Sequence, residues 1–87
     1  MKWAGEAAEM VEQLLQELPL PVREGVQQAA ELRAEELAEK KSAPEISLEL
    51  AVAAFIESTP PDLRQRLKHT LSYRGIDPED YEAAFSA

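Results

Sequence analysis

The chain has 87 residues and lacks several of the residue types from which active sites and metal centres are built. It contains no cysteine, which excludes disulfides, thiolate metal sites and cysteine nucleophiles. Its single histidine, His69, cannot alone supply the several ligands that a zinc site requires. Its three glycines are scattered, so no glycine-rich phosphate loop is present. No catalytic motif is present, so we expect a protein that is not an enzyme on its own, and we expect no covalently bound cofactor.

Long apolar runs are missing as well. No stretch approaches the roughly 20 apolar residues that a helix needs to cross a bilayer, and the N-terminus has no apolar segment typical of a secretory signal. We therefore expect a soluble, cytoplasmic protein. The net charge of −8 argues against nucleic acid as a partner, because binding to phosphates requires a basic face.

Residues that favour helices fill the segments between the prolines, with alanine, leucine, glutamate and glutamine most frequent. Proline lacks an amide hydrogen and is excluded from helix interiors, so the prolines mark where helices begin and end. Both features predict an all-α fold, a compact orthogonal bundle of four to five short helices that forms one domain over residues 1–87. The expected helices cover residues 4–17, 22–41, 48–58, 61–73 and 78–85.

Short polar side chains precede three of these helices and are predicted N-caps, which accept hydrogen bonds from the free amide groups at a helix start. Ser47 precedes the third helix, Thr59 the fourth and Asp77 the fifth. The proline directly after Thr59, and the one after Asp77, each suit the first helical position. Gly75 is expected to end the fourth helix in the left-handed conformation.

Apolar side chains recur every three or four residues along each predicted helix, which places them on one side of it. The third helix is apolar on most sides and is therefore expected at the centre of the core. The alternative is an exposed apolar surface that meets a partner or a second copy of the chain. Gly25 is interpreted as a site of close helix packing, and Trp3 as a core residue, with stacking on a ligand as the alternative. Positions expected to face the core include Ala7, Val11, Leu14, Val26, Ala30, Ala34, Leu67, Leu71, Tyr81, Ala84 and Phe85.

The acidic charge is spread unevenly along the chain. The first 58 residues hold 12 acidic and 5 basic side chains, whereas residues 59–87 hold 5 acidic and 4 basic ones. No acid lies between residues 63 and 76, and that stretch carries the basic segment, which consists of Arg64, Arg66, Lys68, His69 and Arg74.

Two interpretations of the basic segment stay open. It binds a carboxylate, a phosphate or an acidic partner surface, or it contacts the acidic first and second helices of the chain itself. Arg64, Lys68 and His69 are expected at the solvent side or the flanks of the fourth helix. For His69 we expect a surface position, with a role as ligand to a metal or a macrocycle as the alternative.

Four short motifs lie in the first part of the chain. Trp3 leads the first helix, Leu18-Pro19 with Val22-Arg23 forms a junction, Ala30-Glu31 with Ala34-Glu35 lies in the second helix, and Ile46-Ser47-Leu48-Glu49 starts the third. Together they resemble the small helical domain at the C-terminus of the B subunit of light-independent protochlorophyllide reductase, which also occurs as short stand-alone proteins. The resemblance covers residues 3–58, and residues 59–87 are then additional C-terminal helices. The chain departs from the family pattern at Arg33, where an aromatic residue is expected, and at Leu18, where isoleucine is usual. The loop 41–45 also lacks the expected glycine.

The resemblance implies a role in chlorophyll biosynthesis or around the photosynthetic apparatus. The reductase reduces a ring double bond of protochlorophyllide with electrons from iron–sulfur clusters, whereas this chain has no cysteine to hold a cluster. We therefore expect a non-catalytic helical binding or accessory module that docks onto a larger protein or complex, with a tetrapyrrole as a candidate ligand. The alternative is a detached domain that completes a protochlorophyllide reductase active site in trans.

Overall fold

Five α-helices and one short 3₁₀ helix make up most of residues 2–87, the part of the chain that a computed structural model describes. In chain order they are α1 (Gly5–Gln16), α2 (Leu20–Lys40), α3 (Leu48–Ser58), α4 (Pro61–Tyr73), the 3₁₀ helix η1 (Pro78–Tyr81) and α5 (Glu82–Phe85). The predicted all-α fold is confirmed, although the last predicted helix is divided into η1 and α5. Within residues 2–87 no helix has the length and apolar character that spanning a bilayer requires.

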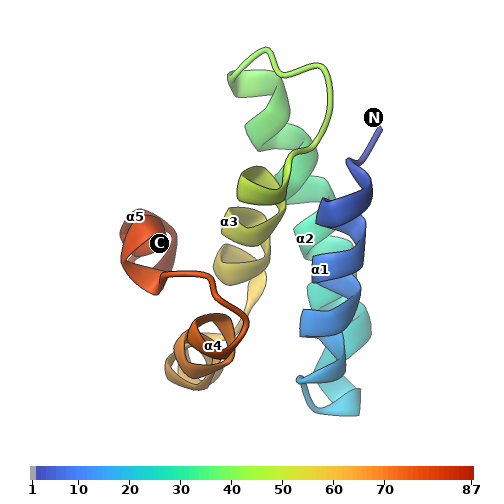
Figure 1. Ribbon diagram of the computed structural model, residues 1–87. Coiled ribbons are helices and arrows are strands. Elements are labelled where there is room, and N and C mark those ends of the chain that lie inside the picture. The colour runs from blue at the N-terminus through green and yellow to red at the C-terminus, as the bar shows by residue number, and fades with distance from the viewer. Residues whose placement is uncertain (1) are drawn as a thin grey trace.

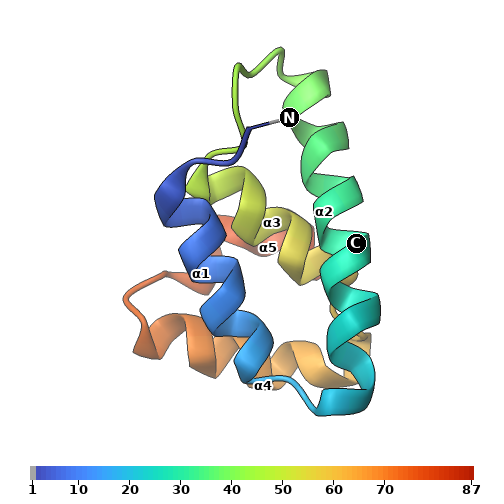
Figure 2. The ribbon, with the colours of Figure 1, turned by 90° about the vertical axis from the view of Figure 1, so that its right-hand side faces the viewer.

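Helix α3 occupies the middle of the fold (Figure 1). Helices α1 and α2 lie on one side of it and α4 and α5 on the other, and α4 runs across the lower ends of α1 and α2 (Figure 2). Six side chains of α3 are buried, which are those of Leu50, Ala51, Val52, Ala54, Phe55 and Ile56. The predicted central position of this helix is confirmed. The alternative of an exposed apolar face is wrong, because the other helices of the chain cover it.

The contact between α2 and α3 is the most extensive in the fold, and α2 contributes mainly small side chains to it. Ala30, Ala34 and Ala38 are fully buried, and such small side chains let two helices approach each other closely. Gly25 takes no part in this packing. It is exposed, and a methyl group added to it would meet no atom within 4 Å, so the interpretation of Gly25 as a close-packing site is wrong.

Two of the three predicted N-caps are confirmed. The Ser47 hydroxyl oxygen accepts a hydrogen bond of 3.3 Å from the Leu50 amide at the start of α3. The Asp77 carboxylate accepts a hydrogen bond of 3.0 Å from the Glu79 amide at the start of η1. Both side chains therefore satisfy amide groups that have no partner within their helix.

The prediction that Thr59 caps α4 is wrong. The Thr59 hydroxyl is buried and donates a hydrogen bond of 2.8 Å to the Phe55 carbonyl in the last turn of α3. The residue at the cap position of α4 is Pro60, and the helix begins at Pro61. The reason is the pair of prolines, because a residue that precedes proline is kept out of the helical region. Pro60 accordingly has an extended ψ of 142°, so it occupies the cap position expected for Thr59 and is not the first helical residue.

Helices α2 and α4 end in the same way, with a residue in the left-handed region. After α4 the Ile76 amide donates a hydrogen bond of 2.9 Å to the Leu71 carbonyl, around Gly75 with a φ of 82°. After α2 the equivalent hydrogen bond, also 2.9 Å, closes around Ser42 with a φ of 52°. The predicted conformation of Gly75 is confirmed, and α2 uses a serine where this helix ending usually has glycine.

The first described residues are tied to the segment that enters α3. Trp3 forms an isolated parallel bridge with Ile46, in which the Ala4 amide donates to the Ile46 carbonyl and the Ile46 amide to the Lys2 carbonyl, each at 2.9 Å. Trp3 is half-buried and packs against the core, as predicted. The bridge holds the start of α1 beside the start of α3.

Candidate functional site: the outer face of helix α4

The five residues of the basic segment have different structural roles. Four of them lie on α4, and Arg74 is the residue directly after it. Arg64 and Arg74 bind to other parts of the chain, Lys68 lies over an aromatic ring, and only the remaining two are fully directed to solvent. The structure therefore brings the five residues to one helix but does not bring them together as one surface.

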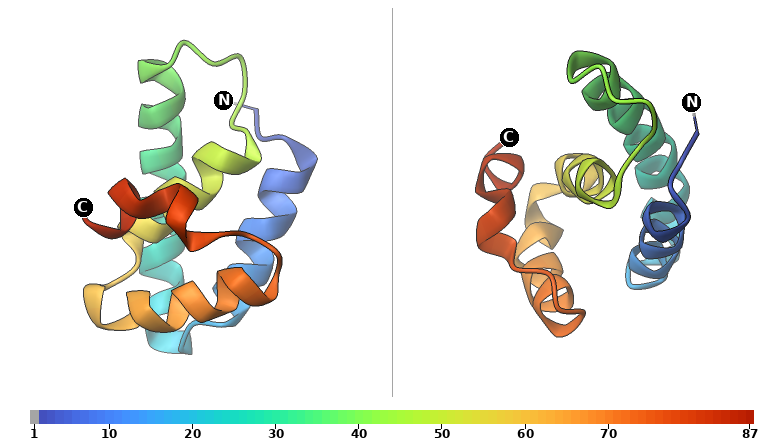
Figure 3. Two further views of the ribbon diagram at one scale, coloured as in Figure 1. Left: turned by 60° about the vertical axis from the view of Figure 1, so that its left-hand side comes forward. Right: turned by 45° about the horizontal axis from the view of Figure 1, so that its top comes forward.

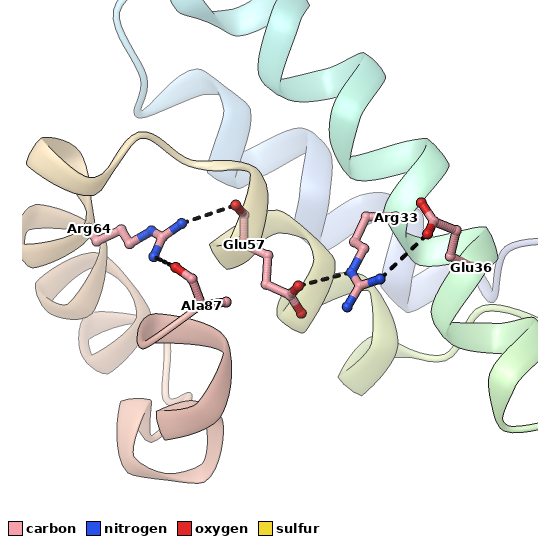
Figure 4. A network of polar contacts seen from close by, with 5 residues as sticks. All are labelled: Arg33, Glu36, Glu57, Arg64 and Ala87. Atoms are coloured by element: carbon pink, nitrogen blue, oxygen red, sulfur yellow. Dashed lines mark hydrogen bonds and ion pairs between the residues drawn. The ribbon is translucent and has the colours of Figure 1, made fainter.

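Arg64 joins the ends of two helices. Its Nε donates to the Thr59 carbonyl at 3.0 Å and its Nη2 to the Glu57 carbonyl at 3.1 Å, both at the end of α3. Its Nη1 donates to the carbonyls of Phe85 at 3.2 Å and Ala87 at 2.6 Å, at the end of α5 (Figure 4). Arg64 was expected at the solvent side or the flanks of the fourth helix, and it is half-buried there. Helix ends leave carbonyls without partners, and the guanidinium satisfies four of them.

Arg74 attaches the end of α4 to α1. Its Nη1 donates to the Gln13 side-chain oxygen, and its Nη2 lies 3.5 Å from a carboxylate oxygen of Glu17. Its Nε is buried without a hydrogen-bond partner among the described residues. Arg74 thus contacts the acidic first helix, as the second interpretation of the basic segment supposes. Within residues 2–87 no hydrogen bond or ion pair joins the side chains of the other four residues to α1 or α2.

Lys68 is exposed, as predicted, but its ammonium group lies 5.1 Å from the centre of the Phe85 ring. At this distance a cation is attracted to the face of the ring, by about 0.5–1 kcal/mol at an exposed site. Lys68 therefore helps to hold α5 against α4 and is only partly available to a partner.

Arg66 and His69 remain, and Tyr73 lies beside them. The three residues follow one another at intervals of three and four along α4 and so share one side of the helix. Arg66 and His69 are exposed, and Tyr73 is 92% exposed. We refer to Arg66, His69 and Tyr73 as the outer face of α4.

The outer face of α4 borders a shallow depression of about 370 Å³ that Glu17 and Arg74 also line. A guanidinium, an imidazole and a phenol gather here, and all three can donate hydrogen bonds to carboxylates or backbone carbonyls. Within residues 2–87 no group of three or more histidine, cysteine or acidic side chains is placed to hold a metal ion. The arrangement is suited to binding an acidic or polar surface.

Tyr73 was absent from the sequence-based set of site residues. The signal that could have found it is its spacing from Leu67 and Leu71, which are buried on the opposite side of α4. A helix whose leucines at these positions face the core must direct residues 66, 69 and 73 to solvent. Such a pattern identifies an exposed tyrosine without any structure.

Comparison of the chain with known protein families, with curated proteins and with solved structures finds no match.

Proposed function

We propose that this protein is a non-catalytic helical binding module that docks onto an acidic surface of a larger protein through the outer face of α4. The observation that carries the proposal is the exposure of Tyr73, 92%, next to two basic side chains that form no hydrogen bond or ion pair within residues 2–87. Tyrosine and arginine are the side chains that most often supply the binding energy of protein interfaces, because they bury much area and form hydrogen bonds. A large ring in solvent has no stabilising role in the fold of this chain.

The distribution of charge also favours the outer face of α4 as the binding surface. The chain has a net charge of −8, so most of it repels an acidic partner. The outer face of α4 lies in the stretch from residue 63 to 76 that contains no acid. An acidic partner would be steered to this face and held in one orientation by it.

The resemblance to the reductase domain extends the proposal to the kind of partner. The motifs of the resemblance lie in the segment from Trp3 to the start of α3, and the bridge between Trp3 and Ile46 joins their two ends. α4 and α5 lie outside the segment that resembles the family. We propose that the larger protein or complex belongs to chlorophyll biosynthesis or the photosynthetic apparatus.

The test is a binding measurement with a matched pair of double variants. The variant Arg66→Glu with Tyr73→Ser removes the charge and the ring of the outer face. The control Lys40→Glu with Leu32→Ser makes the same charge change and removes an exposed apolar side chain, 64% exposed, on α2. A partner that the unmodified chain retains from an extract of photosynthetic cells should be retained by the control and lost by the first variant. Equal retention by both variants, with both folded by circular dichroism, contradicts the proposal.

A second candidate function is the binding of a tetrapyrrole, and the groove between α1 and α2 favours it. This groove has a volume of about 640 Å³, within the size range of small-molecule sites. Trp3, Val11 and Leu15 supply apolar walls. Arg23 also lines the groove; its Nε and Nη2 donate to the carbonyls of Leu18 and Gln16 at 2.9 Å each, which leaves Nη1 for a carboxylate. The probe is protochlorophyllide or a soluble porphyrin, with Trp3 fluorescence and pigment absorption as readouts. Saturable changes in both signals that disappear in Leu15→Glu would support this function, and unchanged signals would exclude it.

The related alternative is a detached domain that completes a protochlorophyllide reductase active site in trans. Its test is a reductase assay with and without the purified chain, using Leu15→Glu as the control variant. A rate that rises with the unmodified chain and not with the variant supports this alternative. A rate that does not change counts against it.

A further inference from the structure

A second groove lies on the other side of α2, between α2, α3 and the C-terminal residues. The C-terminal helices cross over α3 on the side away from α1 (Figures 1 and 3). The groove has a volume of about 610 Å³. Leu37 of α2, Leu50 and Ala53 of α3 and Ala84 of α5 give it an apolar floor.

The two long walls of the groove follow the same pattern. Along α2 and the residue that follows it the pattern is Arg33, Leu37 and Lys41, four residues apart. On α3 it is Glu49, Ala53 and Glu57, also four residues apart. Each wall thus has an apolar middle and charged ends over eight residues, which is about 12 Å of helix. This length corresponds to slightly more than two turns of a third helix laid between them.

The charges at the two ends of the groove differ in whether they are already paired. At one end Arg33 Nε donates to a Glu57 carboxylate oxygen at 2.9 Å, and Arg33 Nη1 lies 3.5 Å from Glu36 (Figure 4). Glu49 and Asp80, which also line the groove, form no ion pair within residues 2–87. The positive charge of Arg33 is therefore balanced, while these two carboxylates are not.

The pKa of Tyr81 reflects its burial and the negative charge of these two carboxylates. This pKa is raised above the ordinary value, first by burial, then by the carboxylates of Glu49 and next of Asp80. Both carboxylates therefore lie close enough to Tyr81, which also lines the groove, to disfavour its ionised form. Across the groove, Lys41 is the basic side chain that lies toward the loop between α2 and α3.

We propose that the groove between α2, α3 and α5 binds an amphipathic helix of a partner protein, with two or three apolar side chains on the floor and a lysine or arginine beside Glu49 and Asp80. The walls are helices whose side chains repeat every four residues, and such ridges accept the ridges of another helix. The unpaired carboxylates require a basic flank on that helix. This surface is additional to the outer face of α4 and has the opposite charge.

The test uses a synthetic helical peptide of leucine and lysine, with leucines on one side and lysines on the flanks. A peptide with glutamate in place of each lysine is its control. Backbone amide shifts of the isotope-labelled full chain should change saturably at Ala53, Tyr81 and Ala84 with the lysine peptide. The glutamate peptide should leave them unchanged. Shifts confined to other surfaces would overturn the proposal.

Paired variants separate binding in the groove from general charge attraction. Glu49→Lys with Asp80→Lys should weaken binding of the lysine peptide about tenfold, because both carboxylates lie beside the peptide. Glu9→Lys with Glu39→Lys makes the same net charge change at exposed positions on α1 and α2 that do not line the groove, and should weaken it by less than about twofold. Equal weakening by both pairs would overturn the proposal.

One further outcome identifies another occupant. A dimer in sedimentation that disappears in Ala53→Lys would show that a second copy fills the groove, and would overturn the proposal. The variant Arg66→Glu with Tyr73→Ser should bind the lysine peptide as the unmodified chain does, because it changes only the outer face of α4. Failure of the groove proposal is thereby distinguished from failure of the proposed function.

Discussion

The guanidinium of Arg64 and the carbonyl oxygen of Ala87 are 2.6 Å apart, although 23 residues separate them in the chain. The same side chain also binds the carbonyls of Glu57 and Thr59, so one arginine connects the end of α3 with the end of the C-terminal helix. In Figure 4 the side chain of Arg64 reaches from α4 to both of these ends. The position of α5, which lines the groove between α2, α3 and α5, depends on this connection.

Replacing Arg64 by methionine keeps most of the volume of the side chain and removes its donors. We expect a loss of about 2 kcal/mol in the free energy of unfolding, because hydrogen bonds from a charged group are lost and carbonyls at two helix ends lose their partner. Urea unfolding measures the loss. Hydrogen exchange should show that residues 82–87 lose protection first. Arg66→Met, on the same helix, should change stability by less than about 0.5 kcal/mol.

Replacing Ala34 by leucine tests the packing of α2 on α3. Ala34 is fully buried in the core, so the larger side chain must displace its neighbours, and we expect a destabilisation of about 2 kcal/mol. Ala29→Leu is the matched control, because it adds the same atoms to an exposed position of the same helix. Thermal unfolding of both variants gives the comparison. A similar melting temperature for the two would contradict the packing described here.

Gly25→Ala should stabilise the protein by roughly 0.5–1 kcal/mol. Glycine in a helix interior is unfavourable relative to alanine, because the unfolded chain with glycine has more conformational freedom. The new methyl group meets no atom within 4 Å, so no steric cost opposes this gain. Chemical denaturation measures the change. A destabilised variant would show that this face of α2 is packed against something.

Substitutions at the two left-handed helix ends should change the free energy of unfolding in opposite directions. Gly75→Ala should destabilise by about 1 kcal/mol, since alanine is disfavoured at a φ of 82° and no packing compensates. Ser42→Gly should stabilise by about 0.5 kcal/mol, since glycine relieves the cost of a serine at a φ of 52° and this relief exceeds its greater freedom in the unfolded chain. Equilibrium unfolding of both variants tests the pair, and the same sign for both would be evidence against these helix endings.

Tyr81 predicts a dependence of stability on pH in the alkaline range. Burial first, then Glu49 and Asp80, raise its pKa in the folded protein above 10.0. The phenol of the unfolded chain titrates at about 10, so above this pH the unfolded state holds fewer protons than the folded state and stability falls as the pH rises. Below about pH 10 the stabilisation is fully present.

The measurement compares the unmodified chain with Tyr81→Phe by urea unfolding at pH values below and above about 10. The unmodified chain should lose stability more steeply than the variant as the pH rises. Glu49→Gln should bring the pH dependence closer to that of Tyr81→Phe, because it removes the larger of the two carboxylate effects that raise the pKa of Tyr81. Parallel curves for all three proteins would refute the assignment.

The sequence predicted the helices better than it predicted the sites. The helix boundaries follow from local signals, since prolines, Ser47, Asp77 and Gly75 act on backbone groups within a few residues. The prediction for Thr59 was wrong even at this level, because Pro60 itself precedes a proline and therefore occupies the cap position. Gly25 was interpreted as a close-packing site, whereas its environment depends on which side of α2 the other helices cover.

The sequence by itself determined that this chain is all-α and that α3 lies in its core, because hydrophobic periodicity and helix signals are properties of short segments. Only the tertiary structure decided which charged side chains are available to a partner. Arg64 and Arg74 look like Arg66 in the sequence, but the ends of α3 and α5 and the side of α1 come within their reach. An arginine binds unpaired carbonyls and carboxylates wherever folding brings them within its reach. The residue pattern of one helix does not show which groups of other helices will lie there.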